Sequence, residues 1–275
     1  MSLYGYPALY ALFVWWFSTG LIIWLDNLPR STFRWSLLGG GIVFAVSLHR
    51  LAASSVDASV AGAYAAFTYG VLLWGWQEMT FFMGVVTGPR KTMCPEDVTG
   101  WRRFWLATET CLYHELAILA TAGAVVTATW NAPNQVGKWT FLVLWVMRQS
   151  SKLNVYFGVL NLNEAFVPEH LKYLCSYMRR QPMNLLFPFT VTASTLMFGW
   201  LLLRAAAPGI TPFHAAGLTF CATMLALGII EHWFLVLPLP FAELWSWVLK
   251  FRATRAYARP IRTRRRGAVP VLTSR

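Results

Sequence analysis

Charged side chains are scarce in this sequence: they make up 12% of its 275 residues, about half the fraction found in soluble domains. Acidic residues are the rarer kind, with 11 Asp and Glu against 23 Lys and Arg. Hydrophobic residues make up 57%, and the mean hydropathy is +0.48. These values exclude a soluble globular domain. Several apolar runs of about 20 residues instead predict an all-α, polytopic membrane protein.

Several familiar sequence signatures are also missing. The four cysteines show no CxxC spacing, which argues against a disulfide framework and against a thiolate metal site. The apolar runs contain no ExxH pair, no HExxH motif and no multiple-histidine box. No basic residue precedes the first apolar stretch, MSLYGYPALYALFVWWF, so we expect a retained first span and not a cleaved signal peptide.

Seven segments are long and apolar enough to cross a bilayer, and short connections rich in Pro, Gly or Asn separate them. The expected spans are Pro7–Leu25, Trp35–Ala53, Ala61–Val86, Phe104–Trp130, Trp139–Leu160, Asn184–Leu203 and Phe213–Leu237. We therefore expect a seven-span bundle over residues 1–240. An amphipathic helix in the membrane interface is expected over 241–258, followed by a basic, disordered tail over 259–275.

The distribution of basic residues predicts the orientation of the bundle. With the amino terminus outside, 18 Lys and Arg fall on the inner side, and only Arg50, Lys138 and Arg204 fall on the outer side. An even number of spans would remove this asymmetry. The basic tail fits contact with an anionic inner leaflet. Nucleic-acid binding is not expected, because no folded basic domain or stacking aromatics accompany the tail.

Ionisable residues inside the apolar runs are the candidate functional residues. Each costs at least about 2.5–3.5 kcal/mol at mid-membrane, so we expect them to face the bundle interior and to pair. The candidates for holding a pigment or a metal are Glu78, His114, Glu115, Glu231 and His232. A supporting polar cluster is expected from Glu109, Arg148, Lys152, Glu164, Glu169 and His170. At ~1.5 Å per residue, all of them lie in the cytoplasmic half of the bundle or at its inner end.

Local spacing adds two expectations about these residues. Arg148 and Lys152 are four residues apart, so they share one helix face and are placed to neutralise glutamates. The adjacent residues His114 and Glu115 lie about 100° apart around a helix and cannot point the same way. The same holds for Glu231 and His232. One member of each pair could face the cluster while the other contacts a neighbouring helix.

Three interpretations of the cluster stay open. The first is an ion-pair network that only fixes helix packing. In the second, a neutral histidine ligates a magnesium tetrapyrrole, or helps to hold a pigment precursor, between aromatic walls. The third is a carboxylate–histidine metal centre of a membrane enzyme, for which the ligands of iron or zinc would come from Glu78, His114, Glu115, Glu231 and His232.

Long strings of the sequence resemble one family. They include SVAGAYAAFTYGVLLWGWQEMTFFMGVVTGPRK, LYHELA, NAPNQVGKWTFLVLWVMR, NLNEAFVPEHLKYL, RRQPMNLLFP and EHWFLVLPLP. These strings resemble the PuhE family, photosynthetic complex assembly proteins of purple phototrophic bacteria that are usually encoded near reaction-centre subunit genes. The resemblance runs from about residue 7 to about residue 250 and does not include the basic tail.

The resemblance implies a multi-pass protein of the bacterial cytoplasmic membrane, with its N-terminus in the periplasm and its C-terminus in the cytoplasm. It implies support for assembly of the reaction centre and light-harvesting complex, by handling bacteriochlorophyll or modulating its synthesis. Partners would be reaction-centre or light-harvesting subunits, or enzymes of pigment synthesis. No catalytic set carries over, so an assembly role is favoured over an enzymatic one. The cofactor stays undecided, with bacteriochlorophyll or a precursor ahead of iron or zinc. The alternative is a membrane metalloenzyme acting on a pigment intermediate or quinone.

Overall fold

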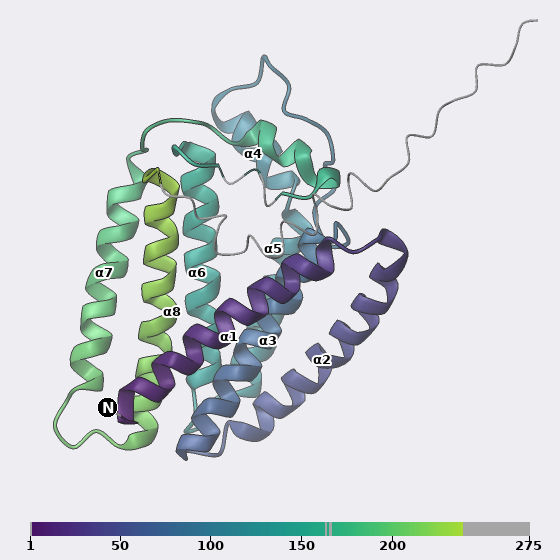
Figure 1. Ribbon diagram of the computed structural model, residues 1–275. Coiled ribbons are helices and arrows are strands. Elements are labelled where there is room, and N and C mark those ends of the chain that lie inside the picture. Colours follow the sequence, from purple (N-terminus) through teal and green to yellow (C-terminus); the bar gives the residue numbers. More distant parts are fainter. Residues whose placement is uncertain (1, 163, 165–166, 239–275) are drawn as a thin grey trace, which may run out of the picture.

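The computed structural model describes residues 2–162, 164 and 167–238, and these form a bundle of helices without a strand (Figure 1). The expected interfacial helix over 241–258 and the tail over 259–275 lie outside these residues. The elements are α1 (Ser2–Asp26), η1 (Arg30–Thr32), α2 (Phe33–Ser54), α3 (Val60–Phe82), α4 (Gly100–Glu109), α5 (Leu112–Ala128), α6 (Val136–Phe157), η3 (Glu169–Tyr177), α7 (Leu186–Ala205) and α8 (Pro212–Val236).

Four of these helices are long and apolar enough to cross a membrane by themselves: Leu3–Asp26, Arg30–Ser54, Leu186–Ala205 and Pro212–Val236. The helices α4 and α5 qualify together as a fifth span, bent by 66°. The described part of this multi-pass protein therefore holds four or five candidate spans, where the sequence predicted seven. The two predicted spans that are not among these candidates are α3, which contains Glu78, and α6, which contains Arg148 and Lys152.

The predicted span over 104–130 corresponds to this bent pair, since the chain bends between α4 and α5. The loop before α4 takes up backbone groups at the bend: Thr87 accepts a hydrogen bond from the His114 amide (2.9 Å), and Arg90 donates one to the Glu109 carbonyl (3.3 Å). Gly88 permits this close approach, because a Cβ there would lie 1.9 Å from the Glu109 carbonyl oxygen. Such long-range contacts leave no local signature in the sequence.

The helix α8 lies at the centre of the bundle. In its most apolar stretch 61% of the residues are buried, against 11% in α1 and in α2. Figure 1 shows α7 and α6 beside α8, α1 crossing obliquely over the bundle, α2 at the opposite edge and α4 at one end. The low burial of α1 and α2 leaves apolar side chains on their outer faces, as expected of helices that contact lipid.

Small residues bring α3 and α6 into close contact. A Cβ added to Gly70 of α3 would lie 2.7 Å from the carbonyl oxygen of Gly137 in α6. Such small residues let helix backbones approach closely in membranes. The contact fixes α6 against α3, which places the polar end of α6 beside the polar end of α3.

Candidate functional site

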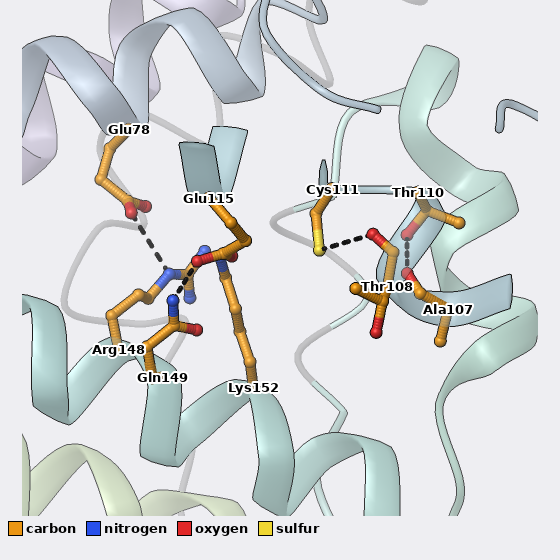
Figure 2. A network of polar contacts seen from close by, with 9 residues as sticks. All are labelled: Glu78, Ala107, Thr108, Thr110, Cys111, Glu115, Arg148, Gln149 and Lys152. Atoms are coloured by element: carbon orange, nitrogen blue, oxygen red, sulfur yellow. Dashed lines mark hydrogen bonds and ion pairs between the residues drawn. The ribbon is translucent and has the colours of Figure 1, made fainter. Parts of the chain in front are cut away.

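Two cations of α6 form ion pairs with neighbouring helices. Arg148 Nε lies 3.3 Å from Glu78 Oε1 of α3, and Lys152 Nζ lies 2.5 Å from Glu115 Oε1 of α5. Gln149 also donates a hydrogen bond from Nε2 to Glu115 Oε2, as Figure 2 shows. The cations one turn apart on α6 thus meet two of the predicted glutamates, and each pair ties α6 to a different helix.

Two cavities flank these ion pairs, and Arg148 lines both. We name the first, of about 290 Å³, the acidic cavity, because Asp26, Glu78 and Glu231 line it together with Arg148. It lies between α1, α3, α6 and α8. We name the second, of about 420 Å³, the basic cavity. Its wall includes Phe81, Phe82, Phe104, Cys111, Glu115, Arg148, Gln149, Lys152, Tyr156 and Tyr177, from α3, α4, α5, α6 and η3.

The acidic cavity includes a carboxylate that the sequence analysis did not select. Asp26 is the last residue of α1, and its Oδ1 is buried without a hydrogen-bond partner. Glu78 is close enough to interact electrostatically with both Asp26 and Glu231. Three acidic side chains and one guanidinium thus line this cavity together. Its position at the inner end of the first predicted span could have identified Asp26 as a candidate from the sequence.

Glu231 also borders the membrane-facing surface of the bundle. It lines an apolar groove between α1 and α8, beside Leu9, Trp16 and Phe234, in addition to the acidic cavity. Trp15 of α1 hydrogen-bonds its carboxyl group. Glu231 is thus the residue at which the polar interior meets the α1–α8 surface.

The two predicted histidines behave differently. His232 is 1% exposed, and both ring nitrogens are engaged: Nδ1 lies 2.8 Å from the Gly228 carbonyl oxygen, and Nε2 lies 2.8 Å from Ser150 Oγ. His114 is fully buried, its ring lies 4.5 Å from that of Phe81, and neither ring nitrogen has a hydrogen-bond partner among the described residues. His114 therefore has free ligand atoms, whereas His232 ties α8 to α6. Each histidine points away from its adjacent glutamate, as the helix geometry predicted.

The other predicted members of the cluster lie apart from the ion pairs. Glu109 lines neither cavity. Glu164 pairs at 3.4 Å with Arg180, and both side chains are largely exposed. Glu169 is exposed as well. His170 Nε2 lies 2.9 Å from the Phe82 carbonyl oxygen and packs over Gly84, so it holds η3 against the end of α3.

Arg103 of α4 lies behind the wall of the basic cavity. Its guanidinium carbon lies 4.9 Å from the centre of the Tyr156 ring, and Nη2 donates a 2.7 Å hydrogen bond to the Tyr177 carbonyl oxygen. The side chain is 7% exposed, and Nη1 is buried without a hydrogen-bond partner. The sequence analysis counted Arg103 only among the inner-side basic residues.

No metal site is formed by the described residues: no three His, Cys, Asp or Glu side chains gather closely enough to hold an ion. Thiol chemistry finds no support at Cys175 of η3 either. Burial raises the pKa of this thiol, so it is protonated at neutral pH and is a poor ligand or nucleophile. The donor set thus does not fit the iron or zinc centre considered from the sequence.

Comparison with known proteins identifies the family. The model of the family described as "Protein of unknown function (DUF3623)" matches residues 1–256. A Rhodobacter capsulatus protein described as "Uncharacterized 30.4 kDa protein in puhA 5'region" is 38% identical over 246 residues, which cover 88% of this chain and 89% of the relative. No solved structure matches the chain. The chain belongs to the DUF3623 family.

Proposed function

We propose that this protein is an assembly factor for bacterial photosynthetic complexes, which acts in the cytoplasmic membrane on bacteriochlorophyll or on its supply. The observation that carries the proposal is the similarity, over nearly the whole chain, to a relative from the puhA 5' region. The resemblance to the PuhE family, whose genes lie near those of reaction-centre subunits, agrees with it. Reaction-centre or light-harvesting subunits, or enzymes of pigment synthesis, would be the partners.

The two cavities support a ligand-handling role over a purely structural one. Partly open cavities of about 290 and 420 Å³ lie on either side of Arg148, near the lower end of the range for ligand pockets. A ligand-handling role would use this space beside the ion pairs.

For a bacteriochlorophyll, we assign the magnesium ligand to one imidazole. His114 has two free ring nitrogens, and its neighbour Phe81 lines the basic cavity. His114 would hold the central magnesium, and the pigment would supply its own near-infrared absorption. His232 would first have to give up its hydrogen bonds to Ser150 and Gly228. We therefore propose that His114 binds the pigment and that His232 holds α8 against α6.

We further propose seven spans, with the amino terminus outside and the carboxyl terminus in the cytoplasm. With 23 and 22 residues, α3 and α6 are ~34 and ~33 Å long, enough to cross the hydrocarbon core. The charges of α6 are paired with Glu78 and Glu115 inside the bundle, which lowers the cost that mean hydropathy assigns to them. Reporter fusions in the loops between helices would test this: periplasmic activity from a fusion at 91–97 would contradict the orientation.

Complementation tests the function directly. In a Rhodobacter capsulatus strain that lacks the gene for the relative, we expect lowered near-infrared absorbance of the photosynthetic complexes and restoration by this chain. Lys152→Met should fail to restore it, whereas the exposed-pair variant Arg180→Gln should succeed. Unchanged complexes and pigment in the deletion strain would overturn the proposal.

A further inference from the structure

We propose that the basic cavity binds an amphipathic anion, in which an apolar or aromatic body carries one carboxylate or phosphate group. The proposal rests on the proposed function, since it takes this cavity as a ligand site, and it deepens that function by naming the class of ligand. A pigment intermediate with a free acid group and an anionic lipid both belong to this class.

The charges around the basic cavity favour an anion. Lys152 is paired with Glu115, and Arg148 is paired with Glu78 on the side of the acidic cavity. Of the groups that line the basic cavity itself, two are cationic and only Glu115 is acidic. Each of these two cations is already paired with a glutamate, so the charge balance depends on Arg103.

Arg103 adds a cation that lies outside the ion pairs formed by the described residues, although the residue is only 7% exposed. Burying an unpaired charge is costly, and a buried donor without a partner adds to that cost. The two residues that contact its guanidinium, Tyr156 and Tyr177, both line the basic cavity. An anion bound there would interact electrostatically with the Arg103 charge behind these two residues.

The rest of the wall selects a ligand with an apolar body. The rings of Phe81, Phe82 and Phe104 line the cavity, with Leu153, Leu162 and Leu174. A small hydrated anion would leave these surfaces without contact, whereas an amphipathic ligand would cover them. Arg90 contacts a residue of the wall, since its Nε donates a 2.5 Å hydrogen bond to Tyr177 Oη. This cation would further attract the acid group.

Binding of fluorescent probes to the purified full-length protein in zwitterionic nanodiscs tests the proposal. The probes are cis-parinaric acid and its methyl ester, which differ in the charge of one group. We expect the acid to bind at least tenfold more tightly than the ester, and Arg103→Met to reduce this preference at least fivefold. Arg180→Gln is the matched control and should leave the preference unchanged. Competition by dodecanoate and by dodecyl phosphate then identifies which acid group is favoured.

Equal binding of acid and ester, or an unchanged preference in Arg103→Met, would overturn the inference. If Arg103→Met does not fold, Arg90→Met removes the cation that contacts Tyr177 and should also weaken binding of the acid. Failure of the probes to bind, with complementation intact, would reject this inference and leave the proposed function standing. Failure of complementation with normal probe binding would reject the proposed function and leave this inference standing.

Discussion

The Lys152–Glu115 ion pair should behave as a coupled unit. The two side chains are only 22% and 20% exposed, and their charged atoms lie 2.5 Å apart. Removing one partner of a buried pair costs about 3–5 kcal/mol because the other charge is left buried and unpaired. Partial exposure screens this pair, so we expect Lys152→Met to lower the free energy of unfolding by about 2–3 kcal/mol.

The double variant Lys152→Met with Glu115→Gln should recover most of that loss. It leaves no unpaired charge, and Gln149 can still hydrogen-bond an amide at position 115. The assay is thermal unfolding in detergent, where a loss of about 2–3 kcal/mol corresponds to a lowering of Tm by roughly 4–12 °C for a chain of this size. The pair Glu164–Arg180 is the control: its side chains are 46% and 67% exposed, and its removal should cost less than about 1 kcal/mol. Destabilisation by the double variant that equals the sum for Lys152→Met and Glu115→Gln alone would refute coupling, because independent sites give additive effects.

Three further predictions address packing and pH. Gly70→Val should destabilise the bundle by about 1–3 kcal/mol, measured by the same unfolding assay, because its Cβ would lie 2.7 Å from the Gly137 carbonyl oxygen. His232→Ala should also lower stability, by about 1–3 kcal/mol, through two lost hydrogen bonds, yet complementation at permissive temperature should survive. The hydrogen bonds of Ser59 lower the pKa of the exposed Asp57 below its ordinary 3.8, so their contribution is complete above pH 3.8 and is lost as the pH falls through the lowered value. Once corrected for the intrinsic rate, amide exchange at the start of α3 should therefore accelerate only in that acidic range. A corrected rate that stays constant between pH 6 and 3 would count against this prediction.

Spacing along a helix predicted part of the site correctly. The four-residue separation of Arg148 and Lys152 predicted a shared face and pairing with glutamates, and both pairs form. The angle between neighbouring side chains likewise predicted that Glu115 and His114 would diverge, and Glu115 meets α6 while His114 packs against Phe81. These features depend only on local helix geometry, which a sequence contains.

Contacts between helices determined the rest. Which glutamate meets which cation depends on how α3 and α5 pack against α6, and no local pattern records that. Asp26 lies at the end of α1 and joins the acidic cavity only because α1 crosses over α3 and α8. Arg103 was obscured for a related reason: its partners Tyr156 and Tyr177 are more than 50 residues away in the chain. The bend before α5 depends equally on a loop that supplies backbone partners from residues 87 and 90.

The central claim, that voids beside the α6 ion pairs hold an amphipathic acid, is tested most directly by native mass spectrometry of the protein purified from phototrophic membranes. The account predicts one bound anionic amphiphile per chain in the wild type, and its loss from Arg103→Met under the same conditions. A wild-type protein that carries no such ligand, or a variant that retains it at equal occupancy, would contradict the account.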